Sequence, residues 1–478
     1  MWATVYDLDP ETWDKIPDNV TSLPTQSSGA IVDNGDGTAT VQYQIVPRAT
    51  WSDGMPMTGA DLAFTAEAMR DLALNGNPHV DPIMANVVET NSVEQVAWVT
   101  FENPTLAIED ALWIILPSHA IADIDLGASD GFSWPSGGPF MVRDGDPSSM
   151  TRNPNYWKTD DAGRQLPYAE SLTFVSLGSE VGKRFGEGDV DVVEIFDNEA
   201  VEGVAAPQGA VVESASAPLV EQITFNLTSP DTPPDGASFN GATAFREAIA
   251  HAIDRSSVLE SAGIAWDATT PGVLIPKGIS AWSQYQYDPG TSRTLVTSLQ
   301  PVTEPISVLS TTINGSARPA IANALGASFA AIGVGYDSEL LDSVQFYGDA
   351  LPNGTFDLGM WAWENDGGFA ATLAMLDRFD PTRPQQSFSG WGTGDETSEA
   401  ALRFSELAEV ARTTMDAHQF SVAVEEAESI LAAELPLIPL FHRSSYLAIR
   451  SDHITGVVHN ATSSRFTWSV ESWQVVGQ

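Results

Sequence analysis

After residue 236 the chain alternates segments of helical periodicity with short apolar runs typical of strands. Apolar side chains recur every three to four residues over Phe245–Ile253 and again over Ile321–Ile332, which leads directly into Gly333-Val334. Two more helical patterns fill residues 397–433, and the second opens at Asp416. Alternating helices and strands predict an α/β architecture.

The first half of the chain has a different pattern. Thr58 and Asp61 have the spacing of a capping box and predict a helix that continues through Ala73. From about residue 75 to 230, short strand-like runs alternate with Gly and Pro clusters, and Asp231–Gly236 resembles a linker. Since the chain has 478 residues and a domain takes roughly 150, we expect about three compact units.

Acidic residues greatly outnumber basic ones, with 64 Asp and Glu against 21 Lys and Arg and a net charge of −43. Such a charge repels phosphate backbones, so we expect no nucleic-acid partner. No window approaches the roughly 18 to 20 apolar residues of a membrane span, so we expect no direct membrane insertion. Only four of the 21 basic residues are Lys. A Lys-poor, acid-rich composition is typical of adaptation to high salt. The compositional bias of a GC-rich genome is the alternative, and it explains the preference for Arg over Lys but not the acid excess.

Motifs for catalysis and metal binding are weak. The chain has no Cys, its seven His form no zinc motif, and the acidic turn Asp33–Gly37 lacks the EF-hand spacing. We therefore expect no metal, no cofactor and no catalytic residue. Residues 127–131 match G-x-S-x-G, but Pro and Gly follow where a helix should begin. A serine hydrolase that uses Ser129 is kept only as an alternative.

Aromatic side chains gather in one segment of this Trp-rich chain. The chain has 14 Trp, and the densest aromatic run is Phe356–Gly368. A strand here would place Trp361 and Trp363 on one face, with Asp366 at the exit of the strand, where loops often carry ligand contacts. A core strand followed by a solvated acidic turn explains the same residues equally well.

Several motifs occur in a fixed order along the chain, and the longest is VPRATWSDGMPMTGADL at residues 46–62. Together they resemble the family 5 extracellular solute-binding proteins, which are the oligopeptide-, dipeptide- and nickel-binding components of ABC importers. Residues 46–62 are similar to the family's LR-x-G-x-x-F-x-DG-x-P-x-T-A-x-D-V signature. The other matching segments are Leu116–His119, Gly138–Phe140, Arg152–Trp157, Leu166–Tyr168, Phe185–Asp191, Phe245–Arg255 and Leu435–Leu440.

The resemblance implies an α/β fold of two lobes, with a ligand cleft between them and an extra subdomain inserted in the first lobe. Lobes of this kind close around a ligand by a hinge motion. We expect the first lobe to comprise residues 1–30, 168–230 and 446–478, the inserted subdomain 31–167, and the second lobe 231–445.

The resemblance also implies a function and ligand contacts. We expect a monomeric, non-enzymatic protein that captures a peptide-like solute and delivers it to ABC permease subunits. Trp363 and Asp366 match the family's D-x-x-x-x-x-W-x-x-D stretch, whose second Asp pairs with the α-amino group of the ligand. Some oligopeptide-binding members of the family carry an Arg three residues before this Trp for the ligand carboxylate, and this chain has Met360 at that position. The expected ligand contacts are Asp366, Trp363, Trp361 and Trp391.

Other cargo and other roles stay open. The same fold could bind an oligosaccharide or a metal chelate, or could report ligand occupancy to a signalling partner. Family members normally begin with a signal peptide and several dozen residues of the first lobe, and no export signal is visible here. We expect the given chain to lack this N-terminal segment and the protein to be extracytoplasmic, in the periplasm or at the cell surface, with or without a lipid anchor. A cytosolic paralogue is the alternative.

Overall fold

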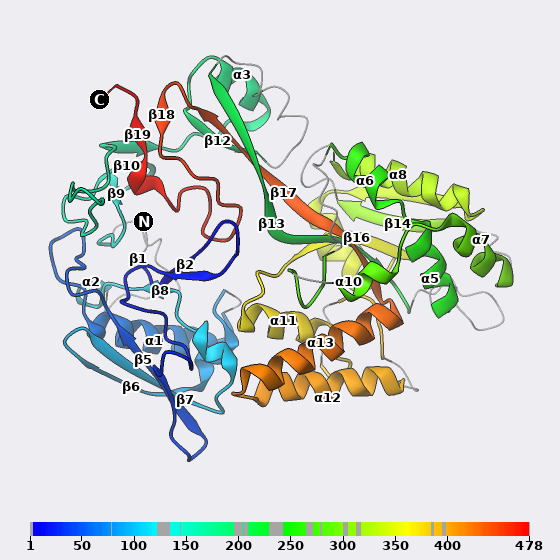
Figure 1. The fold of residues 1–478 in the computed structure, drawn as a ribbon, viewed down its shortest axis with the longest axis horizontal. Coiled ribbons are helices and arrows are strands. Elements are labelled where there is room, and N and C mark those ends of the chain that lie inside the picture. The colour runs from blue at the N-terminus through cyan, green and yellow to red at the C-terminus, as the bar shows by residue number, and fades with distance from the viewer. Residues whose placement is uncertain are drawn as a thin grey trace.

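The structure is a computed structural model in which two lobes are joined by two long strands (Figure 1). The architecture is α/β, as the sequence predicts. The residues that the structure describes are 3–77, 79–121, 134–143, 145–195, 204, 209–228, 242–263, 271–277, 280–299, 305–311, 317–383, 387–393 and 398–477.

A six-stranded sheet runs through both lobes in the order β12-β17-β13-β16-β14-β15. The long strands β13 and β17 pair antiparallel along most of their length, with two interruptions of register between Ser216 and Gln222. In the first lobe β12 pairs with β17, and in the second β16 pairs with β13. The bounds are β12 Val192–Ile195, β13 Ala210–Phe225, β14 Ile306–Thr311, β15 Tyr336–Leu341, β16 Leu358–Glu364 and β17 Leu437–Arg450.

Helices pack around the second-lobe part of this sheet, and most of them contribute apolar side chains to one core with it. The helices predicted over Phe245–Ile253 and Ile321–Ile332 and the two within 397–433 are confirmed. Asp416 begins the last of them by accepting hydrogen bonds from the N–H groups of His418 and Gln419. The bounds are α5 Thr243–Ala252, α6 Arg255–Ser261, α7 Pro289–Ser298, α8 Ala317–Ala331, α9 Ser343–Gln345, α10 Leu351–Asn353, α11 Phe369–Phe379, α12 Glu399–Thr413 and α13 Ala417–Glu434.

A separate four-stranded sheet, in the order β4-β5-β7-β6, packs against α1. Val41 and Tyr43 of β5 are buried while Gln42 between them is exposed, which is the alternation expected of a strand with one solvated face. The predicted capping box of Thr58 and Asp61 is present at the start of α1. The bounds are β4 Ile31–Asp33, β5 Thr38–Gln44, α1 Gly59–Leu74, β6 Val87–Val93 and β7 Val96–Glu102.

The remaining first-lobe elements are short, and both ends of the chain lie in this lobe (Figure 1). Short strands such as β11 agree with the strand-like runs predicted between about residues 75 and 230. The strands β13 and β17 themselves pass from one lobe to the other, so the limits of the lobes along the sequence stay a prediction. The linker-like residues 231–236 lie outside the described part of the chain. The bounds are β1 Ala3–Thr4, β2 Tyr6–Leu8, β3 Lys15–Pro17, β8 Ile114–Ile115, α2 Ser118–Ile121, β9 Phe140–Arg143, β10 Asp146–Arg152, β11 Ser171–Thr173, α3 Val181–Gly186, β18 Ile454–Thr455 and β19 Gln474–Val475.

Candidate ligand-binding site

Two neighbouring cavities lie where the hairpin of β2 and β3 faces the second lobe. The larger, of about 590 Å³, is walled by the hairpin region, residues 274–277, the start of α11 and α13. The smaller, of about 270 Å³, lies between the hairpin, residues 110–114 and the start of α11. Lys15 and Asp366 line both cavities. Because both lobes contribute walls, and because the volumes suit a small ligand, we take these cavities as the candidate site.

Asp366 reaches the cavities because it follows β16 directly. Backbone hydrogen bonds pair β16 with β13 through Glu364, which lies opposite Leu219. Asn365 then donates its N–H to the carbonyl of Pro218 at 2.8 Å, and the strand ends. One oxygen of Asp366 accepts a hydrogen bond of 2.9 Å from the N–H of Gly368. This turn fixes the carboxylate at the exit of the strand, where the sequence places it.

Lys15 brings a cation to the same place from the other lobe. Its ammonium forms an ion pair with Asp110 and lies 5.0 Å from the ring centroid of Tyr6. Burial lowers the pKa of Lys15 to about 8, although the nearby carboxylates of Asp366 and Glu109 oppose this shift. The other oxygen of Asp110 accepts a hydrogen bond of 2.9 Å from the N–H of Ala370 in α11. The carboxylate of Asp110 therefore connects the two lobes beside the cavities.

Two buried polar side chains hold residues 273 and 274, the second of which lines the larger cavity. The carboxylate of Glu428 accepts hydrogen bonds from the N–H groups of Val273 at 2.8 Å and Leu274 at 2.6 Å. Asn365 donates to the carbonyls of the same two residues, at 2.9 and 3.2 Å. Burial raises the pKa of Glu428, and the hydrogen bonds that its carboxylate accepts from Leu274 and Val273 oppose the rise. Neither residue was predicted from the sequence, although a Glu between Val424 and Leu431 on an apolar helix face is a visible signal.

The predicted aromatic contacts are mainly core residues. Trp361 is 0% exposed and Trp391 is 3% exposed, and neither lines the two cavities. The rings of Trp361 and Trp363 pack edge to face at 6.0 Å, as expected for two side chains on one face of a strand. The guanidinium of Arg378 lies over the ring of Trp363, 4.0 Å from the ring centroid, in a cation–π contact. Of the four predicted contacts, Asp366 lines the two cavities, and Trp361, Trp363 and Trp391 do not.

An aromatic and cationic group that lines the larger cavity was also not predicted from the sequence. The ammonium of Lys277 lies 3.9 Å from the ring centroid of Trp13 and donates a hydrogen bond to the carbonyl of Glu11. Trp13 packs edge to face on His442 at 5.4 Å. The backbone of Trp13 has a φ of +65°, which is rare for a bulky residue and costs conformational energy.

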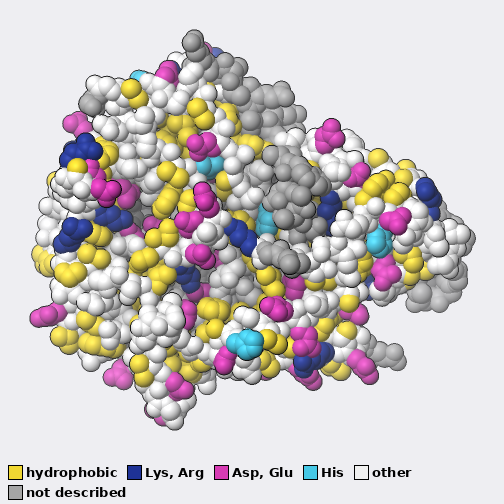
Figure 2. Space-filling view, in the orientation of Figure 1, with side chains coloured by type: hydrophobic (Ala, Val, Ile, Leu, Met, Phe, Trp, Pro, Cys, Tyr) yellow, Lys and Arg dark blue, Asp and Glu magenta, His cyan; other side chains and the backbone are white. Residues whose placement is uncertain are grey.

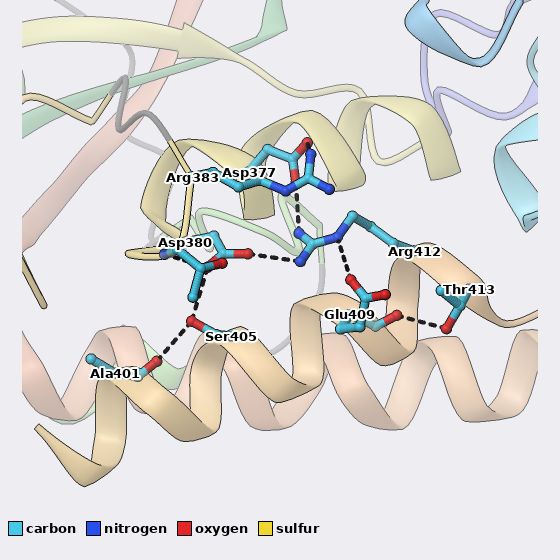
Figure 3. Close-up of polar contacts among 9 residues, drawn as sticks. Asp377, Asp380, Arg383, Ala401, Ser405, Glu409, Arg412 and Thr413 are labelled. Carbon is cyan, nitrogen blue, oxygen red and sulfur yellow. Dashed lines mark hydrogen bonds and ion pairs between the residues drawn. The ribbon is translucent and has the colours of Figure 1, made fainter. Parts of the chain in front are cut away.

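The helix that begins beside Asp366 is fixed at its far end to α12. Arg412 of α12 binds Asp377 and Asp380 of the α11 end, each at 2.7 Å (Figure 3). Ser405 donates to Asp380 at 2.9 Å. Although burial opposes ionisation, hydrogen bonds from neighbours that include Arg412 and Ser405 hold the pKa of Asp380 below its usual range. These bonds keep α11, and hence the Asp366 turn, in place.

Other predicted features give no second site in the described part of the chain. Ser129 lies outside the described residues. Among those residues, no three His, Asp or Glu side chains are grouped so that they could hold a metal ion. No described helix has the length and apolar character needed to cross a bilayer. Figure 2 shows Asp and Glu side chains scattered over one face of the molecule, with fewer Lys and Arg among them.

Comparison with known proteins gives a match over most of the chain. Residues 27–382 match the model of the bacterial extracellular solute-binding proteins, family 5 middle. The peptidoglycan-binding protein YepA of Agrobacterium fabrum is 29% identical over 34% of this chain and 28% of its own length. The oligopeptide-binding protein OppA of Mycobacterium tuberculosis is 23% identical over 91% of this chain and 74% of its own length. The chain thus spans less than a third of the one relative and about three quarters of the other.

Solved structures share the fold. The putative peptide-binding protein AppA from Clostridium difficile superposes with a TM-score of 0.75 at 14% identity, covering 99% of this chain and 94% of that protein. An identity this low supports the fold alone. The two-lobed fold predicted from the sequence is confirmed.

Proposed function

Because the chain belongs to family 5 of the bacterial extracellular solute-binding proteins, we propose that it captures a peptide-like solute outside the cytoplasm and delivers it to the permease of an ABC importer. The position of Asp366 carries this proposal, since its carboxylate lines cavities to which both lobes contribute. A ligand that contacts both lobes favours the closed arrangement over the open one. The protein acts as a monomer and releases its cargo unchanged.

In this proposal the α-amino group of the cargo pairs with Asp366. One oxygen of this carboxylate accepts the N–H of Gly368, and an ionised carboxylate has further acceptor positions for an ammonium group. The main chain of an extended peptide would supply the other hydrogen bonds. Trp361 and Trp363 act indirectly, by packing β16 so that Asp366 emerges at a fixed place.

The test compares ligands with and without the charged amine. After a screen of short peptides by native mass spectrometry, calorimetry would compare a bound peptide with its N-acetylated form. Loss of a charge-assisted hydrogen bond costs about 1.5 to 3 kcal/mol, so acetylation and Asp366→Asn should each weaken binding about 10- to 100-fold. Asp337→Asn, at an exposed position of β15, is the matched control and should change little.

Two outcomes would contradict the proposal. Equal affinity of the free and acetylated peptides would remove the role of Asp366. Cleavage of the bound peptides by the pure protein would replace capture by an enzymatic function, and mass spectrometry of the recovered ligand detects it directly.

A further inference from the structure

A short segment of the first lobe, Leu106–Asp110, reaches the second lobe beside the candidate site. It comprises the 3₁₀ helix Leu106–Glu109 and the residue that follows it. Thr105 fixes the start of this helix, since its hydroxyl accepts a hydrogen bond of 3.0 Å from the N–H of Ala107. The helix contacts α11 of the second lobe. The segment is therefore an ordered contact between the lobes.

Two side chains of the segment contact the second lobe. Leu106 is 1% exposed and belongs to the apolar core of that lobe. Asp110, whose side chain is 6% exposed, accepts a hydrogen bond of 2.9 Å from the N–H of Ala370 in the first turn of α11. The positive end of the helix dipole also favours a carboxylate there. One contact is apolar and the other is a charge-assisted hydrogen bond, and both are shielded from water.

The other side chains of the segment hold it in the first lobe. Ile108 is 0% exposed and belongs to the apolar core of the four-stranded sheet and α1. Glu109 accepts a hydrogen bond of 2.9 Å from the N–H of Gln26, and Lys15 forms an ion pair with Asp110. Because the segment is anchored in the first lobe, separation of the lobes has to break the contacts that Leu106 and Asp110 make with the second.

These contacts favour the closed arrangement of the lobes whatever the cargo is. When the lobes separate, the side chain of Leu106 leaves an apolar core and the N–H of Ala370 loses the carboxylate of Asp110. Both changes cost free energy, since apolar surface is exposed and a charge-assisted hydrogen bond is broken. Buried contacts of this kind are screened little by salt, in contrast to charges on the surface.

We propose that Leu106–Asp110 is a latch that keeps the lobes closed and thereby sets the affinity for the cargo and the rate of its release. A ligand that binds only the closed arrangement has an apparent affinity proportional to the fraction of protein that is already closed. A weaker latch lowers this fraction and speeds release. The inference goes beyond the proposed function, because it does not depend on the identity of the cargo.

The test measures the separation of the lobes in protein without ligand. The chain has no Cys, so Leu74→Cys in α1 and Leu402→Cys in α12, at positions that are 65% and 51% exposed, can carry two spin labels. Pulsed electron paramagnetic resonance then gives the distribution of distances between the lobes. Leu106→Ala and Asp110→Ala should each lower the ratio of closed to open protein about 10-fold or more. Asp110→Asn should have a smaller effect, because its amide oxygen can still accept the N–H.

Matched controls come from the same segment. Ile108→Ala and Glu109→Ala remove side chains that contact the first lobe. Ile108→Ala should lower the melting temperature, because it leaves a cavity in the first-lobe core. Neither control variant should change the distances between the labels. Circular dichroism establishes that each variant is folded before its distances are compared.

Two results would overturn the latch. One is an unchanged distance distribution in the double variant Leu106→Ala, Asp110→Ala. The other is an equal shift in the control variants Ile108→Ala and Glu109→Ala, which would show a general loosening of the segment. Calorimetry with a bound peptide should show affinity reduced up to about 10-fold by Asp110→Ala, with the closed distances restored at saturation. Failure of every peptide to bind would reject the proposed function, while the distances in ligand-free protein would still decide the latch.

Discussion

Asp7 is an acidic residue in an unfavourable environment. It is largely buried near the carboxylates of Asp18 and Glu471, with the ammonium of Lys158 as the nearby opposite charge. Burial and, next, the charge of Asp18 raise the pKa of Asp7 to about 7, although Lys158 opposes the shift. In the unfolded chain an Asp titrates near 3.9. The folded state therefore binds the proton more tightly, and its stability falls as the pH rises from about 4 to 7.

Asp7→Asn should remove this loss of stability. At pH 4.5 the free energy of unfolding of the variant should differ little from that of the natural protein. At pH 8, where the native carboxylate is ionised, it should be larger by on the order of 1 to 4 kcal/mol. Urea unfolding at the two pH values measures the difference. An equal effect at both values would show that Asp7 titrates normally in the folded state.

Single residues of the site were only partly predictable from the sequence. The strand pattern that ends before Asp366 left its role open, and the resemblance to the family singled it out; in the structure Asp366 lines the cavities. The roles of Trp361 and Trp391 depend on what covers each indole, and strand periodicity does not contain that information. Lys15 and Lys277 line the same cavity as Asp366 although they come from segments distant in sequence, so only the tertiary fold brings them together.

At the scale of elements, the contact of α11 with α12 depends on Arg412. Its side chain is 13% exposed and binds Asp380, whose side chain is 0% exposed. Arg412→Met would leave a buried carboxylate without its cationic partner, although hydrogen bonds from Thr382 and Ser405 remain. We expect a loss of about 3 kcal/mol in the free energy of unfolding, and weaker ligand binding because α11 begins beside Asp366.

Arg403→Met supplies the matched control for this contact. Arg403 also lies in α12, but its side chain is 48% exposed and it pairs with Glu426 of α13. Exposed ion pairs contribute about 1 kcal/mol or less, so the loss should be small. Urea unfolding and calorimetry of both variants test the difference, and similar losses for the two would refute a special role for Arg412.

Elements with strong local signals were predicted well. The capping box of α1 and the apolar faces of α8 and α13 specify these helices from nearby residues alone. The long strands β13 and β17 were seen only as short runs. Their length comes from pairing with each other across 14 to 16 residues, which is a non-local property that single-segment periodicity does not reveal.

At the scale of the whole molecule, β13 and β17 carry a buried charge cluster that connects distant segments. Glu221 of β13 binds Arg318 of α8 and Arg443 of β17, and Glu221 and Arg318 are no more than 3% exposed. Burial would raise the pKa of Glu221, but the positive charges of Arg443 and Arg318 hold it below its usual value. Buried and paired charges of this kind depend little on salt, in contrast to the exposed acidic surface.

The exposed surface determines how the molecule responds to salt. Its 43 excess negative charges repel one another more strongly in the compact state than in the expanded chain, so they oppose folding. The Debye length falls from about 10 Å at 0.1 M salt to about 3 Å at 1 M, which screens this repulsion. The same screening weakens the surface ion pairs, but each of these contributes little. Because acids outnumber cations about threefold, reduced repulsion should be the larger effect.

We therefore expect the melting temperature to rise between 0.1 and 1 M NaCl. Sucrose at matched osmolality controls for general stabilisation by excluded solutes and should give a smaller rise, because it does not screen charge. Calorimetric melts across the series measure both effects. A rise with NaCl well above that with sucrose favours adaptation to high salt as the origin of the acidic composition. A flat or falling melting temperature would contradict adaptation to high salt as the origin of the acidic composition.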